Sequence, residues 1–243
     1  MKNILKNKKS FITGVTGAVG FELARLFLKN KCKLFITGKN HSKLISRYKK
    51  LKIEFPKEKI FFKQCDLYSY NEIDKLCNLV LKKLKNVDIL VNCAGIFSIE
   101  NLNRINSKKF DEMFAVNVKA PIIITKNFIE TMRLNRWGRI INIGSSSSYE
   151  GFEKTVLYCS SKHALLGFSR SIYKEYKKYG IRSLIFSPGS IKSKMSKKIK
   201  NQDYRTFLDA KDVAQVILSN IQSDTQLVIP EMIIKRIAQD EKK

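Results

Sequence analysis

A tyrosine and a lysine four residues apart could perform acid–base chemistry. In YCSSK (158–162), Tyr158 and Lys162 occupy positions i and i+4 of a predicted helix, so they share one face with about 5–6 Å between their Cβ atoms. Because a nearby ammonium favours tyrosinate, we expect the pKa of Tyr158 to fall below its usual value of about 10. The phenol could then exchange a proton near neutral pH. An isolated pair of this kind is more often part of a surface helix, so its context decides.

Serine and asparagine residues extend the candidate site. Ser145 ends a predicted strand thirteen residues before Tyr158, and Asn117 lies in a predicted helix. Ser145 begins a run of four serines, so Ser146 is the alternative at this position. Cys159 follows Tyr158, but nothing positions a base for it, and burial in the core is the simpler interpretation.

A glycine-rich turn predicts a site for phosphate groups. The segment TGVTGAVG (13–20) follows a predicted strand at 9–13 and opens a helix. Gly14 can form the tight turn, Gly17 can let the backbone approach a pyrophosphate, and Gly20 can pack the helix against the strand. The helix N-terminus offers unpaired N–H groups and the positive end of its dipole. Between a strand and a helix, this spacing indicates a dinucleotide-binding site.

The end of the second predicted strand bears on the choice of cofactor. An NAD site usually has a carboxylate here that accepts from the ribose 2′-hydroxyl. This chain has Gly38 and Lys39, with no acidic residue between Glu22 and Glu54. A 2′-phosphate would be attracted by Lys39, so NADP(H) is favoured over NAD(H). The alternative is that Lys39 is one more solvated lysine.

Strand-like and helix-like segments alternate along the chain. Uniformly apolar strands suit a parallel sheet covered on both faces, and the alternation predicts an α/β fold with a single Rossmann-type, doubly wound parallel sheet. We therefore expect one dinucleotide-binding and catalytic domain over residues 1–243, with ligands beyond the carboxyl ends of the strands. The expected strands are 9–13, 33–37, 59–67, 87–94, 139–145, 182–188 and 226–234, and the expected helices are 17–30, 69–85, 107–134, 155–179 and 210–222.

Composition excludes several classes of protein. The 243 residues are 44% hydrophobic, which is too apolar for disorder, and we find neither a secretory signal nor a membrane span. Five cysteines without a CxxC pair indicate reduced cytoplasmic thiols and no metal site. The net charge of +26 comes from lysines spread along the whole chain. Codon bias in an AT-rich genome explains that pattern better than specific nucleic-acid binding, for which no motif is present.

Taken in order, these motifs resemble the short-chain dehydrogenase/reductase family. The resemblance extends from residue 9 to about residue 193. The matching elements are TGVTGAVG (13–20), Asp66, NCAG (92–95), Asn117, Ser145, YCSSK (158–162) and PGSIKS (188–193).

The resemblance implies a role for each catalytic residue. Tyr158 would be the general acid in ketone reduction and the base in alcohol oxidation. Lys162 would hold the nicotinamide ribose and lower the pKa of the tyrosine. Ser145 would hydrogen-bond the substrate carbonyl oxygen, and Asn117 would position a water that links Lys162 to solvent.

The resemblance also implies a cofactor-binding set in which Tyr158 and Lys162 take part. Asp66 would contact the adenine, residues 92–95 would line the adenosine ribose, and the residues after the sixth strand would flank the nicotinamide. The other members of the set are Gly14, Thr16, Gly17, Val19, Gly20, Lys39, Asp66, Leu67, Asn92, Ala94, Gly95, Pro188, Gly189, Ile191 and Ser193.

We therefore interpret the chain as an NADP(H)-dependent oxidoreductase that acts on a small carbonyl or alcohol substrate, most readily as a ketone reductase. One alternative is a 3-oxoacyl-(acyl-carrier-protein) reductase, although the tail lacks the Gly-Gly segment typical of those enzymes. A non-catalytic, nucleotide-binding regulatory protein of the same fold is another. The chain departs from the family pattern at two positions. Ala18 replaces the usual glycine, with Gly17 one residue earlier still allowing close backbone approach, and Cys93 replaces an asparagine, which alters packing more than chemistry.

Residues 190–205 fall where the family places a segment that covers the substrate. It could be a mobile lid for an anionic or carrier-bound substrate, or simply a solvated loop. Its lysines are Lys192, Lys194, Lys197, Lys198 and Lys200. The resemblance further implies a homodimer or homotetramer formed through helices 107–134 and 155–179.

Overall fold

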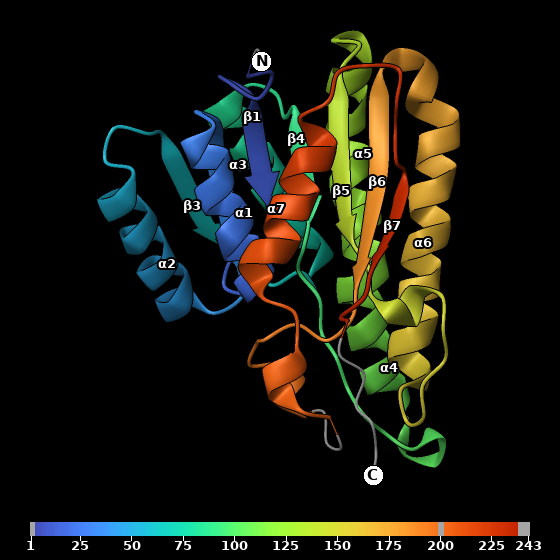
Figure 1. The fold of residues 1–243 in the computed structure, drawn as a ribbon. Helices are drawn as coiled ribbons and strands as arrows, with labels where there is room; N and C mark the ends of the chain where they lie inside the picture. The colour runs from blue at the N-terminus through green and yellow to red at the C-terminus, as the bar shows by residue number, and fades with distance from the viewer. Residues whose placement is uncertain (1–2, 199–201, 238–243) are drawn as a thin grey trace.

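Seven parallel strands form one sheet in the computed structural model, which describes residues 3–198 and 202–237. The strand order is β3-β2-β1-β4-β5-β6-β7, and every neighbouring pair is parallel. Figure 1 shows this sheet between two layers of helices, as the sequence predicts. The strands are β1 (Lys9–Ile12), β2 (Lys33–Gly38), β3 (Ile60–Gln64), β4 (Ile89–Asn92), β5 (Gly138–Ile143), β6 (Ile181–Pro188) and β7 (Glu231–Ile234).

The strand order changes direction at β1. The chain adds β2 and β3 on one side of β1 and then returns to place β4 on the other side. The loops after β1 and β4 therefore begin next to each other at the carboxyl edge of the sheet. In open α/β sheets this reversal is where ligands bind.

Helices cover both faces of the sheet. Buried residues of α1, α2 and α7 share one hydrophobic cluster, and those of α3 and α5 share another. Side chains alternate along a strand, so Ile12 of β1 packs in the first cluster and Phe11 in the second. The helices are α1 (Ala18–Lys29), α2 (His41–Glu54), α3 (Tyr70–Leu84), α4 (Ser107–Phe114), α5 (Ala120–Leu134), α6 (Val156–Tyr176) and α7 (Ala210–Ile221).

Two helical segments differ from the sequence-based expectation. Helix α2 was not predicted, because basic residues dominate it and only Leu44 and Leu51 are buried. The expected helix 107–134 is divided into α4 and α5 by a π-helical turn at Ala115–Lys119. Several strands are also shorter than expected. For example, only Glu231–Ile234 of the apolar run 226–234 pairs with β6.

The described ranges, 3–198 and 202–237, lack two features. They contain no helix long and apolar enough to cross a membrane. They also contain no group of three His, Cys, Asp or Glu side chains that could hold a metal ion.

Candidate active site

Tyr158 and Lys162 lie together near the start of α6. Lys162 is buried, and its Nζ atom lies 5.7 Å from the centre of the Tyr158 ring. The Nζ atom donates a hydrogen bond of 2.8 Å to the carbonyl oxygen of Ile143, the last residue of β5. The structure thus places the two side chains on one face of the helix, at the carboxyl edge of the sheet.

The pKa of Tyr158 is raised, so the expectation of a lowered value was wrong. Burial is the main cause, because it disfavours the phenolate, and a hydrogen bond with Ser145 only partly offsets it. Burial also lowers the pKa of Lys162 to about 8. Its ammonium points to the Ile143 carbonyl oxygen, so it does not overcome the burial of the phenol.

Ser145 is the serine that contacts the tyrosine. It is the N-cap of a short 3-10 turn, Ser146–Ser148, where its Oγ accepts from the Ser147 N–H at 3.2 Å. The side chain of Ser148 accepts from the Ser145 N–H at 3.2 Å, which completes a capping box. The hydrogen bond between Ser145 and Tyr158 favours Ser145 over Ser146 as the serine of the candidate site.

Asn117 lies in the π-helical turn and is 1% exposed. Its Oδ1 accepts from the Ile96 N–H at 2.9 Å, and its Nδ2 donates to the Ile96 carbonyl and to Ser161 Oγ, both at 3.0 Å. A Cβ built on Gly95 would lie 3.4 Å from Asn117 Oδ1 and 3.8 Å from Lys162 Nζ. The amide therefore fixes the loop after β4 against α6, beside Lys162.

The glycine turn lies against the loop after β4. Gly14 has a φ of +71°, and a Cβ there would lie 2.6 Å from the Ala94 Cα, so glycine is required. Gly17 is the N-cap of α1 and has no side chain that could cap the first N–H groups. A Cβ on Gly20 would lie 2.7 Å from the Gly14 carbonyl oxygen. Gly20 thus lets α1 pack closely against the backbone that follows β1.

Sequence reasoning missed two residues that shape this region. Thr13 Oγ1 accepts from the N–H groups of Cys93 and Ala94, at 3.1 and 3.2 Å, and so holds the β4 loop to the end of β1. Phe97 packs edge to face against Tyr158 with 4.8 Å between ring centres. Threonine at the end of the first strand was an available signal, whereas nothing in the sequence around Phe97 indicated its position.

Lys39 and Asp66 form an ion pair at the carboxyl edges of β2 and β3, with 2.8 Å between nitrogen and oxygen. The hydrogen bond to Asp66 raises the pKa of Lys39. Burial opposes ionisation of Asp66, but Lys39 and the Tyr68 N–H outweigh it and lower the pKa of the carboxyl group. The Lys39 side chain is 76% exposed, and exposed pairs contribute only about 0–1 kcal/mol. Lys39 can therefore exchange this partner for another anion.

The remaining predicted cofactor residues differ in what they expose. A Cβ on Gly38 would lie 2.8 Å from Thr16 Cγ2, so Thr16 packs against the end of β2. Asn92 is 3% exposed and donates to Asn142 Oδ1 at 2.9 Å. Val19 and Leu67 are also buried, at 7% and 8% exposure. The side chains of Asn92, Val19 and Leu67 thus belong to the core, and only their backbone atoms are left for a ligand.

The residues after β6 form a connected segment. Pro188 ends β6, the Gly189 N–H donates to the Ile234 carbonyl at 2.9 Å, and Ile191 forms a parallel bridge with Leu208. The Ser193 hydroxyl donates to Ser196 Oγ. These bonds attach the start of the expected lid to β7 and to the residues before α7.

The rest of the expected lid is described in part. Lys192, Lys194 and Lys197 are exposed. The side chain of Lys198 and the whole of Lys200 lie outside the described residues. Arg236, which follows β7, donates to Thr206 Oγ1, one residue beyond the end of the segment, at 2.8 Å.

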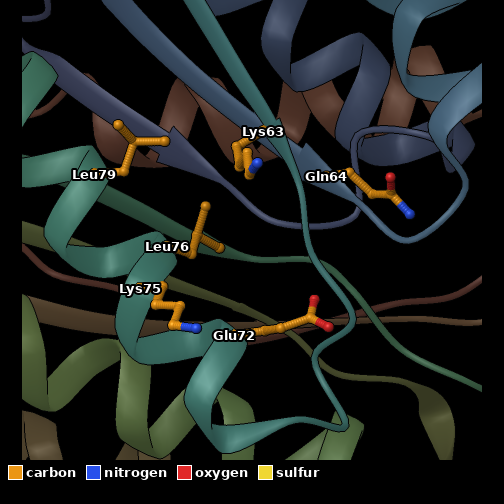
Figure 2. A pocket seen from close by; sticks show the side chains of 6 residues that line it. All are labelled: Lys63, Gln64, Glu72, Lys75, Leu76 and Leu79. Atoms are coloured by element: carbon orange, nitrogen blue, oxygen red, sulfur yellow. The ribbon is translucent and has the colours of Figure 1, made fainter.

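A cavity of about 370 Å³ lies elsewhere, between the edge strand β3 and helix α3 (Figure 2). None of its lining residues belongs to the predicted catalytic or cofactor-binding set, but two of them bond to members of that set: Gln64 Nε2 donates to the Lys39 carbonyl oxygen at 3.0 Å, and Glu72 Oε2 accepts from the Asp66 N–H at 2.8 Å. The residues that line it are Lys63, Gln64, Glu72, Lys75, Leu76 and Leu79.

Comparison with known proteins decides the family. The family model of the short chain dehydrogenases matches residues 8–204, which is most of the chain. The chain belongs to this family of oxidoreductases. The resemblance inferred from the sequence motifs is therefore confirmed.

Relatives within the short-chain dehydrogenase family include both assigned and unassigned enzymes. The chain is 36% identical over 195 residues to the 3-oxoacyl-(acyl-carrier-protein) reductase FabG of Rickettsia typhi, a match that covers 80% of this chain and 77% of that protein. It is 26% identical over 235 residues to an uncharacterized oxidoreductase of Staphylococcus saprophyticus, covering 96% of this chain and 99% of that protein.

Solved structures share the fold. A metagenomic short-chain oxidoreductase in complex with NADP matches with a TM-score of 0.83 and 23% identity, over 97% of this chain and 99% of that one. An alcohol dehydrogenase from Thermococcus sibiricus, complexed with 5-hydroxy-NADP, matches with a TM-score of 0.87 and 18% identity, over 98% of this chain and 100% of that one. The doubly wound fold predicted from the sequence is confirmed.

Proposed function

We propose that this protein transfers hydride between NADP(H) and a small carbonyl or alcohol substrate, chiefly as a ketone reductase. The observation that supports this most is the meeting of Ser145, Tyr158 and Lys162 at the carboxyl edge of the sheet, next to the glycine turn. We also propose that residues 1–243 act as one domain.

The residues around the turn fit a nicotinamide dinucleotide. Gly14 has a positive φ, and Gly17 leaves the first N–H groups of α1 without a side-chain cap, which is the backbone arrangement that binds phosphate. Gly95 has no side chain beside Lys162 Nζ, which would lie 3.8 Å from a Cβ at that position. When bound, the dinucleotide supplies the hydride.

Each catalytic residue has a task that its surroundings favour. Because burial raises the pKa of Tyr158, its phenol stays protonated at neutral pH and can donate a proton to the carbonyl oxygen of a ketone. Ser145 hydrogen-bonds the same oxygen and stabilises the charge that develops on it. Lys162 holds the ribose hydroxyl groups of the cofactor. Asn117 acts by holding the Ile96 backbone, since its side-chain bonds go to protein atoms.

The decisive experiment replaces Tyr158 with Phe and measures reduction of a panel of ketones with NADPH. We expect kcat/KM to fall by about 10³-fold or more, because the proton donor is lost, while the NADPH affinity measured by fluorescence changes little. Tyr173→Phe is the matched control, because Tyr173 lies later on the same helix. If Tyr158→Phe keeps a tenth of the wild-type activity, the proposed mechanism is wrong.

The preference for NADP(H) rests on Lys39, whose exposed ammonium follows Gly38 where NAD sites carry a carboxylate. Both solved structures named above contain NADP or a derivative of it. We expect Lys39→Glu to lower kcat/KM for NADPH by at least about tenfold, because one charge-assisted contact is lost. Turnover with NADH should stay nearly unchanged. An equal fall in kcat/KM with both cofactors would show that Lys39 does not determine cofactor specificity.

The sequence identity with the Rickettsia reductase favours a second candidate function, that of a 3-oxoacyl-(acyl-carrier-protein) reductase. The exposed lysines of the 190–205 segment would then attract an anionic, carrier-bound substrate. Replacing Lys192, Lys194 and Lys197 with Gln should raise KM for a charged thioester far more than for a neutral ketone. A protein that binds NADPH but reduces neither substrate would instead be the regulatory alternative.

We also propose that α4, α5 and α6 form the interface of a homodimer or homotetramer.

A further inference from the structure

Glu231, the first residue of β7, binds two side chains near the candidate active site. Its Oε2 accepts from the Tyr149 hydroxyl at 2.9 Å. Arg170 donates to it twice, from Nε to Oε1 at 2.7 Å and from Nη2 to Oε2 at 2.9 Å. Such a paired geometry fixes orientation as well as distance. One carboxylate therefore connects three separate elements of the fold.

These elements include the two that hold the proposed catalytic hydroxyl groups. Tyr149 directly follows the 3-10 turn that Ser145 caps. Arg170 lies on α6, eight residues after Lys162. Tyr158 lies in the first turn of the same helix. Ser145 and Tyr158 come from different segments, so their hydrogen bond depends on how the turn sits against the helix. Glu231 joins that turn to that helix through the side chains of Tyr149 and Arg170.

We propose that Glu231 is a positioning residue that sets Ser145 against Tyr158 in the oxidoreductase reaction. The inference rests on the function proposed above. Tyr149 packs against the buried cluster of Leu165, Leu166 and Ile185. Its ring cannot easily rotate away, so without Glu231 its hydroxyl would lose its charged acceptor in a half-buried place and would keep the Ser187 hydroxyl as a neighbour. The turn would then move so that the Tyr149 hydroxyl can hydrogen-bond with water, and Ser145 would move with the turn.

The test is Glu231→Ala, with kcat and KM measured for a ketone that the wild type reduces and NADPH affinity measured by fluorescence. We expect kcat to fall about tenfold, as for a small misplacement of a catalytic group, while KM and the NADPH affinity stay within about twofold. Glu54→Ala is the matched control. It removes the carboxylate that Arg25 holds in the same two-bond geometry, at 2.7 and 2.8 Å, on α1 and α2.

Tyr149→Phe tests the same connection without removing the ion pair. We expect a smaller fall in kcat, and the double variant Tyr149→Phe with Glu231→Ala should be no slower than Glu231→Ala alone, because both changes break one chain of contacts. Glu231→Gln, which keeps an acceptor for Tyr149, should recover part of the lost rate. If Glu231→Ala does not fold, Tyr149→Phe and Glu231→Gln still give the answer.

Three outcomes overturn the proposal. They are an unchanged kcat in Glu231→Ala and Tyr149→Phe, an equal loss in Glu54→Ala, and fully additive losses in the double variant. A wild-type protein that reduces no ketone would instead contradict the proposed function, so the two failures are distinguishable.

Discussion

At the scale of single residues, Lys162 is the clearest case of a group whose charge is costly. Burial lowers its pKa to about 8 from an ordinary value of 10.5. Between these two values the unfolded chain binds a proton that the folded protein has released. The free energy of unfolding therefore rises with pH across this window. Below pH 8 the folded protein bears the full cost of the buried ammonium.

Replacing Lys162 with Met should remove that cost. The fall in the pKa from 10.5 to about 8 corresponds to about 3 kcal/mol. Losing the hydrogen bond to Ile143 offsets about 1 kcal/mol of it. We expect Lys162→Met to be more stable than the wild type by about 2 kcal/mol at pH 7, with the difference shrinking by pH 9.5. Denaturant unfolding at both pH values measures this. A variant less stable at pH 7 would show that the ammonium is better solvated than its burial indicates.

At the scale of elements, Gly14 is the glycine of the turn between β1 and α1 that needs both a positive φ and a close backbone approach. Alanine at position 14 would have to adopt a φ of +71° and would place its Cβ 2.6 Å from the Ala94 backbone. We expect Gly14→Ala to lower the free energy of unfolding by about 2 kcal/mol or more, since neither backbone segment can move freely. Thermal or denaturant unfolding measures the change.

Gly167 provides the opposite control. It lies inside α6, where a Cβ would meet no atom within 4 Å. There Gly→Ala should stabilise by up to about 1 kcal/mol, because alanine is the better helix former. Destabilisation of equal size at both positions would mean that lack of space around Gly14 is not the reason why alanine is unfavourable there.

Some elements of the fold could be predicted from the sequence for identifiable reasons, and so could the shared helix face of Tyr158 and Lys162. Motifs that depend on backbone geometry, such as the glycine turn and the Tyr158–Lys162 spacing, are visible because the spacing itself is the signal. Helix α2 was missed because its buried side is narrow, with Leu44 and Leu51 buried. The π-helical turn around Asn117 has no spacing signature, since an inserted residue leaves the helical pattern on both sides intact.

Long-range contacts explain the remaining misses. The bond between Tyr149 and Glu231 joins residues 82 positions apart, and the one between Thr13 and Cys93 joins residues 80 apart. No local pattern reports such a pairing. The pKa of Tyr158 was predicted in the wrong direction for the same reason, because it depends on how deeply the folded chain buries the phenol.

At the scale of the whole molecule, the net charge of +26 should weaken the fold at low ionic strength. Lysines repel one another across the surface, and the ion pairs that the structure describes are largely exposed, as for Lys39 with Asp66 and Arg205 with Asp203. Such pairs contribute little, so repulsion is the larger effect. Salt screens it, since the Debye length falls from about 20–30 Å near 0.01–0.02 M to below about 8 Å above 0.15 M.

We therefore expect the midpoint of thermal unfolding to rise between 20 and 300 mM NaCl, by about 2–4 °C for each kcal/mol of repulsion that is screened. Choline chloride at equal ionic strength should give the same rise, because screening does not depend on the identity of the cation. Any RNA binding should weaken steeply over the same range without sequence preference, as for contacts with phosphates alone. A midpoint that falls with salt would instead mean that attractive ion pairs dominate this surface.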